Sequence, residues 1–200
     1  MTRSLILHVG WRKTGSTALQ NFIFENSVDQ TLQHLVVPAA GRVVQNRTVG
    51  ARVTAHHGLG GLAFRERSAR AWRDLKSFVT SSDCDEFLIT SEMFSSHLLR
   101  GDGHHDRLAR CLSMFDRVRV ICWLRRQDEY TVSLAVQAAK HGGTGRERGD
   151  SEPKNWPRDA DYSLALGKIS DVVSRVEITP RLYRGGATDV VAEGIELLGL

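Results

Sequence analysis

The sequence has no segment suited to crossing a membrane. None of its apolar runs reaches the roughly 18 consecutive apolar residues that a membrane-spanning helix requires. The N-terminus also lacks a basic and then apolar leader, since strand-like residues begin almost at once. These absences argue against a membrane-spanning or exported protein, and we expect a soluble cytoplasmic protein without a membrane partner.

Cysteine is scarce, and its spacing argues against two further classes of protein. The three cysteines, Cys84, Cys111 and Cys122, do not show the close paired spacing of a metal site. Cys122 lies within an apolar run, where a small buried thiol is an ordinary occupant. We therefore expect reduced structural thiols rather than a disulfide framework or a cysteine-ligated metal.

Chain length and net charge exclude fewer classes of protein than the missing membrane segment and the cysteine spacing do. The chain has 200 residues, of which 41% are apolar, and this suits a single domain over residues 1–200 with a sizeable core. The net charge of +4 fits an anionic substrate, but it fits a nucleic-acid-binding protein equally well. Charge alone therefore does not identify the partner; the loop motifs favour a small anion, and we expect no nucleic acid.

A strand, a tight polar loop and a helix are predicted at the start of the chain. Residues 5–9 form an apolar run typical of a buried parallel strand, and the following loop is rich in glycine and hydroxyl residues. From Ser16 onward, apolar residues at helical spacing predict an amphipathic helix to about Asn26. A helix that opens directly after a glycine loop directs unpaired backbone N–H groups toward that loop. This arrangement predicts an anion-binding site.

The loop is close to the nucleotide-binding pattern G-x-x-x-x-G-K-[ST], but its lysine is displaced. Two glycines and the final hydroxyl residue match, whereas Ser16 stands where the pattern has lysine, and the only lysine lies earlier, at Lys13. An NTPase also needs an acidic residue at the end of a second strand to hold magnesium, but the run 118–124 ends in two arginines. The pattern favours a site that binds a multiply charged anion with protein cations and without metal.

Two motifs together resemble those of sulfotransferases. Residues 13–17, Lys-Thr-Gly-Ser-Thr, resemble the 5′-phosphosulfate loop of that family. Residues 124–133 resemble its 3′-phosphate motif, in which a serine follows an arginine, here Arg125 and Ser133. The resemblance covers about the first 140 residues and is closest to bacterial sulfotransferase-like proteins. It implies an enzyme that moves a sulfuryl group from 3′-phosphoadenosine 5′-phosphosulfate (PAPS) to an acceptor hydroxyl on a small molecule or a carbohydrate, without a metal.

The rest of the chain predicts an α/β fold with three layers, a P-loop-like parallel sheet flanked by helices on both faces. Beyond the opening unit, the predicted strands cover residues 34–38, 86–90, 118–124 and 176–183, and the predicted helices cover residues 69–79, 106–115, 128–140, 161–176 and 188–198. Pro180 limits the last strand to a sheet edge. His8 is expected to be a hydrogen-bonded core histidine, and Trp123 is expected to pack on the sheet.

The remaining stretches are predicted to be loops. A polar loop follows Pro38 as far as Gly50, residues 55–63 are loop-like and then helical, and residues 141–157 form a mobile loop or lid. The acceptor would be selected by loops 41–61 and 141–157. Neither carries a pattern that identifies it.

The resemblance assigns roles to the residues of both motifs. Lys13 is the candidate catalytic cation for the charge that develops on the bridging oxygen. The candidate phosphosulfate cradle consists of Arg12, Lys13, Thr14, Gly15, Ser16 and Thr17, through backbone N–H groups and hydroxyls. Arg125 and Ser133 are the candidate clamp for the 3′-phosphate, while Arg126 would pair with Asp128 or Glu129. The alternatives are an exposed lysine in an ordinary turn and a serine that packs its helix on the sheet.

The general base is predicted at one of two positions. Glu92 follows the strand 86–90, at the topological place where animal cytosolic sulfotransferases carry a catalytic histidine. A glutamate there needs a raised pKa, or it orients the acceptor or Lys13 instead. His56 and His57 form the rival pair, with a pKa near working pH but in a less anchored loop. We place Glu92 ahead of His57 because adjacent histidines in loops are more often solvated.

Departures from the family pattern keep two other functions open. Ala18 stands where many cytosolic sulfotransferases place a tryptophan against the adenine, and the late Arg-Lys-Gly loop is absent. One alternative is a nucleotide kinase with a degenerate phosphate loop, against which the displaced lysine and the missing strand-end aspartate argue. The other is a nucleotide-binding module that has lost catalysis.

Overall fold

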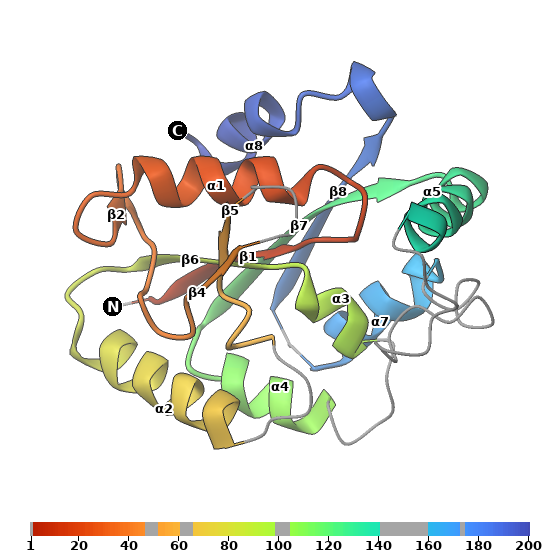
Figure 1. Ribbon diagram of the computed structural model, residues 1–200. Helices are drawn as coiled ribbons and strands as arrows, with labels where there is room; N and C mark the ends of the chain where they lie inside the picture. The colour runs from red at the N-terminus through yellow and green to blue at the C-terminus, as the bar shows by residue number, and fades with distance from the viewer. Residues whose placement is uncertain (1, 47–51, 61–65, 99–104, 141–159, 173–174) are drawn as a thin grey trace.

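A six-stranded sheet forms the centre of the computed structural model, which describes residues 2–46, 52–60, 66–98, 105–140, 160–172 and 175–200 (Figure 1). Every neighbouring pair of strands in it is parallel except the first. In spatial order the strands are β2 (Thr31–Leu32), β3 (Leu35–Val36), β6 (Glu86–Ser91), β1 (Ser4–Val9), β7 (Arg117–Arg125) and β8 (Val176–Tyr183). A separate antiparallel pair joins β4 (Val43–Asn46) and β5 (Arg52–Ala55).

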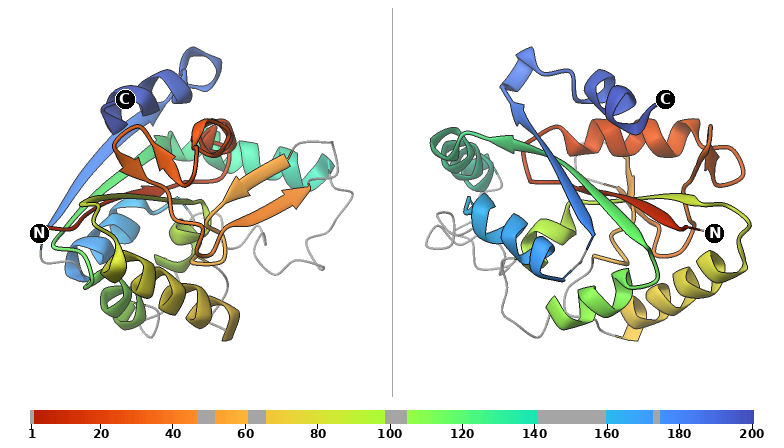
Figure 2. Two further views of the ribbon diagram at one scale, coloured as in Figure 1. Left: turned by 90° about the vertical axis from the view of Figure 1, so that its left-hand side faces the viewer. Right: turned by 180° about the vertical axis from the view of Figure 1, so that it is seen from behind.

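Helices cover both faces of the sheet (Figure 1, Figure 2). One face carries α1 (Ser16–Asn26) and α8 (Val190–Leu198), which the short 3₁₀ helix Gly185–Ala187 precedes. The other face carries α2 (Glu66–Ser81), α3 (Met93–Leu98), α4 (His105–Leu112), α5 (Gln127–Lys140) and α7 (Tyr162–Val172). The predicted three-layer α/β architecture is therefore confirmed.

The alternation of side chains along β1 explains why two layers of helices are needed. Leu5 and Leu7 pack in the core with residues of α2, α4 and α7, whereas Ile6 packs in the core with residues of α1 and α8. Consecutive strand residues point to opposite faces, so a strand apolar on both faces is stable only in the middle of the sheet. β1 occupies that position, between β6 and β7.

Several local predictions are confirmed. The first helix ends at Asn26, and the strand that contains Pro180 is the edge strand β8, paired with β7. The helix predicted over residues 188–198 is α8, which Asp189 caps by accepting two backbone N–H bonds and which Gly199 ends in the left-handed conformation. These features depend on residues next to one another in sequence, which is why the sequence alone predicts them.

Other local predictions were wrong. The polar loop predicted from Pro38 to Gly50 contains the strand β4, which pairs with β5, an unpredicted strand just beyond that loop. The Thr54 N–H of β5 donates to Asn21 Oδ1 of α1. Strands of four residues are too short to show a clear alternation in sequence. The helix α3, which follows β6 almost directly, was also not predicted, because its six residues are too few to show a helical period in the sequence. The helices predicted to reach residues 115 and 176 end at Leu112 and Val172. The predictions for residues 61–63 and 141–157 lie outside the described residues.

Close packing of α8 on α1 leaves no room for a side chain at Gly194. A Cβ atom there would lie 2.5 Å from Leu19 Cδ1, and Leu19 is fully buried. We expect Gly194→Ala to lower the free energy of unfolding by about 1–3 kcal/mol, because α8 must shift or Leu19 must change its rotamer.

The matched control is Gly167→Ala in α7, whose Cβ would meet no atom within 4 Å. The higher helix propensity of alanine should raise its stability by about 0.5–1 kcal/mol. Urea denaturation measures both changes, and an equal loss of stability in the two variants would contradict the packing argument.

Candidate functional site

Three neighbouring strands end at one edge of the sheet and place the predicted residues there (Figure 1). β1 lies between β6 and β7, and all three are parallel, so the segments that follow them lie side by side. The loop of residues 10–15, which the sequence predicts to bind phosphate and which we call the phosphate loop, follows β1. Glu92 follows β6, and Arg125 is the last residue of β7. The Gly10 N–H donates to the Ser91 carbonyl over 3.3 Å, which ties the start of the loop to the end of β6. Ligands of open α/β sheets bind at this edge.

The loop holds an exposed lysine in a left-handed backbone conformation. Lys13 has a φ of 64°, and Gly15 has a φ of 74°. For a residue with a side chain this conformation costs about 1–2 kcal/mol, which the exposed Lys13 side chain does little to offset by packing. Strain of this kind concentrates at functional sites, where the surrounding loop imposes it.

The first turn of α1 follows directly and faces its N-terminus toward the loop. Gly15 is the N-cap residue, and it has no side chain to occupy the backbone N–H groups of that turn. The buried Thr14 hydroxyl donates to the Trp11 carbonyl over 2.7 Å, so its proton stabilises the loop. Of the hydroxyls predicted for the cradle, that of Thr14 is therefore engaged within the loop.

Glu92 lies against the phosphate loop. A Cβ atom on Gly10 would lie 3.2 Å from Glu92 Cα and 3.0 Å from Ser16 Cβ, so the absence of a side chain at Gly10 permits this approach. Glu92 is half-buried and follows the last residue of β6. The structure thus brings Glu92 and the phosphate loop together, although they are far apart in sequence.

Arg125 and its neighbour Arg126 lie in different environments. The Arg125 side chain is 23% exposed, and its Nε–H donates to Glu129 Oε2 over 3.2 Å. The exposed Arg126 pairs with Asp128 over 2.9 Å, as one of the two predicted pairings. Ser133 is half-buried in the second turn of α5, the helix that follows Arg125.

The two adjacent histidines are anchored, contrary to the prediction of a loosely held pair. His56 is fully buried, its Nε2–H donates to the Pro38 carbonyl over 2.8 Å, and its Nδ1 accepts the Thr90 N–H over 3.0 Å. Burial lowers the pKa of His56 to about 4, so it is a neutral structural residue with both nitrogens occupied. His57 is also buried, and its Nδ1 hydrogen-bonds with Ser91 Oγ over 2.9 Å, next to Glu92.

His8 is the hydrogen-bonded core histidine that the sequence predicts, and together with His56 it should make stability fall in acid. Its Nδ1 lies 2.7 Å from Thr90 Oγ1, and burial lowers its pKa to about 4, as it does for His56. An unfolded histidine titrates near 6.5, so below that pH the unfolded chain binds protons that the folded protein does not. Stability that is present above pH 6.5 is therefore lost as the pH falls toward 4.

We expect each of the two histidines to contribute about 2 kcal/mol to the loss of stability between pH 7.5 and pH 5. Urea denaturation at the two pH values measures the sum. The variant His8→Asn keeps a hydrogen-bonding group for Thr90 and should lose about half as much as the unsubstituted protein. Equal stability at the two pH values would contradict the expectation.

An aromatic group at the site was missed by sequence reasoning. Tyr183, the last residue of β8, lies between the loop and Arg125: a Cβ on Gly15 would be 3.5 Å from its Cε2, and the Arg125 guanidinium lies 5.7 Å from its ring centre. Trp11 and Tyr162 contact each other edge to face at 5.3 Å. The position of Trp11 in the loop is a signal in the sequence for aromatic side chains at this site. The sequence does not show that β8 and α7 bring Tyr183 and Tyr162 close to the loop, because this is a tertiary contact.

No group of three or more His, Cys, Asp or Glu side chains among the described residues could hold a metal ion. No helix in the described part of the chain is both long and apolar enough to cross a membrane.

Comparison with solved structures shows a sulfotransferase-like fold. A sulfotransferase from Alicyclobacillus acidocaldarius matches 100% of this chain and 82% of its own, with a TM-score of 0.57 and 16% sequence identity. The sulfotransferase domain from the curacin biosynthetic pathway matches 100% of this chain and 75% of its own, with a TM-score of 0.50 and 9% identity. No family model matches the sequence, and no curated protein matches it.

Proposed function

We propose that this protein transfers the sulfuryl group of PAPS to an acceptor hydroxyl, with small molecules and carbohydrates as the acceptor classes. The observation that carries the proposal is the order of β6, β1 and β7, which puts Glu92, the phosphate loop and Arg125 at one edge of the sheet. The sulfotransferase-like fold of the chain supports it. The sulfuryl group of PAPS is activated because its sulfur is bonded to an oxygen that bridges to the 5′-phosphate.

The loop has the features that binding of the 5′-phosphosulfate requires. The first-turn N–H groups of α1 would donate to the phosphate oxygens, and the helix dipole favours their negative charge. The exposed Lys13 would place its ammonium group against the bridging oxygen. Because negative charge on this oxygen grows as the sulfur–oxygen bond breaks, the cation stabilises the transition state more than the ground state.

Arg125 is suited to the 3′-phosphate, the group that distinguishes PAPS from ATP. Its Nε–H is engaged by Glu129, but a guanidinium has five N–H donors, and the terminal nitrogens would serve a phosphate. Ser133 would add a hydroxyl from α5. Tyr183, between Arg125 and the loop, offers an aromatic surface for the adenosine where Ala18 provides none.

Glu92 would accept the proton of the attacking hydroxyl. As the acceptor oxygen bonds to sulfur, the bond from sulfur to the bridging oxygen breaks, and the proton passes from the acceptor to the Glu92 carboxylate. The other product is 3′,5′-phosphoadenosine, whose new phosphate charge Lys13 and the α1 N–H groups would hold.

Arg125 and Arg126 form a matched pair for testing donor binding. We expect Arg125→Gln to weaken 3′,5′-phosphoadenosine binding about 10- to 100-fold, because a charged hydrogen bond to a phosphate contributes about 1.5–3 kcal/mol. Arg126→Gln removes the same charge from an exposed residue paired with Asp128 and should change the affinity less than about threefold. Isothermal titration calorimetry measures both, and equal losses would contradict the assignment.

The same calorimetry tests the function as a whole. The proposal predicts that 3′,5′-phosphoadenosine binds more tightly than ATP or GTP, with or without magnesium. Preference for ATP with magnesium would overturn it in favour of a kinase. Tight binding of 3′,5′-phosphoadenosine without transfer of labelled sulfate to any acceptor tested would instead support an inactive nucleotide-binding module.

A further inference from the structure

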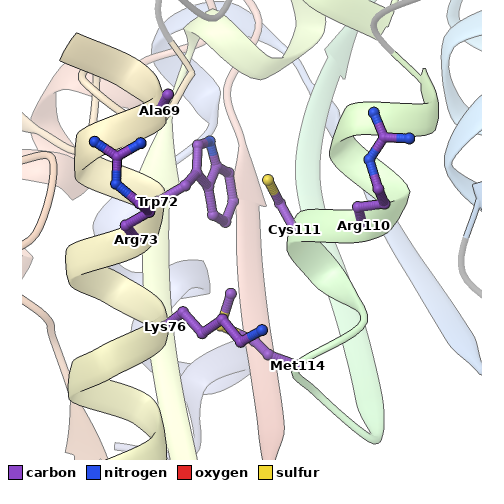
Figure 3. A pocket seen from close by; sticks show the side chains of 7 residues that line it. All are labelled: Ala69, Trp72, Arg73, Lys76, Arg110, Cys111 and Met114. Carbon is purple, nitrogen blue, oxygen red and sulfur yellow. The ribbon is translucent and has the colours of Figure 1, made fainter. Parts of the chain in front are cut away.

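A cavity with cationic side chains lies between α2 and α4, and no residue of the proposed donor site lines it (Figure 3). Its volume is about 400 Å³, within the range of about 300–1,000 Å³ that is usual for small-molecule sites. The lining residues are Ala69, Trp72, Arg73, Lys76, Arg110, Cys111 and Met114.

The apolar part of the cavity is held rigidly. Trp72 is only 5% exposed, and its indole N–H donates to the Leu59 carbonyl over 3.1 Å, which fixes the orientation of the ring. In Figure 3 the Trp72 ring on α2 faces the Cys111 thiol on α4. Met114 completes this surface just beyond α4, and methionine adapts to differently shaped apolar groups.

The charges around the cavity have one sign. Arg73, Lys76 and Arg110 contribute three positive charges, and among the described residues no acidic side chain lines the cavity. The acidic residue Asp74 of α2 pairs instead with Arg70, which is not a lining residue. In Figure 3 the Lys76 side chain extends from α2 toward Met114, so its ammonium group lies beside the apolar surface.

We propose that this cavity binds a small amphipathic anion, a molecule with an apolar body and one carboxylate, sulfate or phosphate group. The apolar body would lie against Trp72 and Met114, and the anionic group would bind Lys76. The guanidinium groups of Arg73 and Arg110 point away from Lys76 in Figure 3 and would contribute only positive charge around the cavity. An aromatic and aliphatic surface beside unbalanced positive charge is complementary to such a molecule and unfavourable for a cation. The proposal does not depend on the sulfotransferase function.

The test compares three ligands that share an octyl chain: n-octyl sulfate, octyl glucoside and octyltrimethylammonium, all below their micelle concentrations. In isothermal titration calorimetry we expect one molecule of octyl sulfate to bind per chain, at least about tenfold more tightly than either other ligand. The variant Lys76→Met keeps the apolar stem and should weaken octyl sulfate binding at least about tenfold. Arg70→Gln, which removes one charge from α2 outside the cavity, should leave it within about twofold.

A second measurement locates the bound ligand. In a Cys84→Ser background the half-buried Cys111 is the more accessible remaining thiol, since Cys122 is fully buried. Octyl sulfate should slow the reaction of Cys111 with N-ethylmaleimide severalfold, and octyl glucoside should not. Equal affinity for the three ligands, unchanged binding in Lys76→Met, or labelling of Cys111 unaffected by octyl sulfate would each overturn the proposal.

Discussion

A Lys13→Gly variant is expected to be more stable than the unsubstituted protein and yet to lose at least about a hundredfold in kcat. The gain in stability follows from the backbone, because Lys13 has a φ of 64°, where glycine avoids a steric cost of about 1–2 kcal/mol. The larger entropy of glycine in the unfolded chain cancels part of this, so the net gain should be about 0.5–1 kcal/mol. The loss in kcat follows because removing one group that stabilises a developing oxyanion typically costs about 10²–10³-fold.

Gln33 provides a matched control for the backbone effect. It is also exposed, it has a φ of 53°, and it lies in the turn between β2 and β3 rather than in the phosphate loop. Gln33→Gly should therefore show a similar gain in stability with an unchanged kcat. Urea denaturation and transfer of labelled sulfate measure the two quantities in each variant.

The expectation for Lys13 fails if Lys13→Gly retains a kcat within about fivefold of the unsubstituted enzyme. Lys13 would then be an exposed residue in an ordinary strand-to-helix turn. The charge-retaining variant Lys13→Arg separates charge from geometry: a large loss there as well would mean that the position of the ammonium group matters, since a guanidinium is planar and longer. Opposite changes in stability and activity cannot come from misfolding of the loop, which would lower both.

The parts of the site that the sequence predicts are the parts encoded locally. The strand, glycine loop and helix of residues 4–26 depend on hydrophobic periodicity and on neighbouring residues, and each is found within a residue or two of its predicted place. The pairing of Arg126 with Asp128 is equally local. The alternation of strands and helices predicts parallel strands, and the parallel direction puts the ends of β6, β1 and β7 at one edge of the sheet. The order of the strands in the sheet is not predicted by the sequence pattern.

The parts that the sequence does not predict depend on contacts between distant segments. His56 resembles a solvated loop histidine in sequence, but Pro38 and Thr90 bring two backbone partners to its ring, which makes it a buried neutral residue. Tyr183 reaches the loop because β8 crosses beside β7, and no pattern around it in sequence indicates a ligand. The antiparallel pair of β4 and β5 was not predicted, because its strands are too short to show a clear alternation of apolar and polar residues.

Glu92→Gln is the second substitution with a large expected effect, a fall in kcat of about 10²–10⁴-fold. Glutamine has nearly the same shape as glutamate, but it cannot accept the proton of the acceptor hydroxyl. Glu92 lies against Gly10 of the phosphate loop, which is where a base must stand if the acceptor attacks a sulfuryl group held over that loop. The affinity for 3′,5′-phosphoadenosine should change less than about threefold, because the proposed donor contacts do not include Glu92.

The rival base, His57, can be tested with an equally conservative change. The Nδ2 of asparagine reproduces the position of histidine Nδ1, so His57→Asn keeps a hydrogen-bonding group for Ser91 Oγ, from which His57 lies 2.9 Å away. If Glu92 is the base, His57→Asn should retain kcat within about fivefold while Glu92→Gln does not. Near-normal turnover of Glu92→Gln combined with inactivity of His57→Asn would reverse the assignment. If both variants lose much of their kcat with donor affinity intact, the pH dependence of the His57→Asn activity decides between the two roles. A pH dependence equal to that of the unsubstituted enzyme would make Glu92 the proton acceptor and His57 a positioning residue. An altered pH dependence would contradict that division of roles.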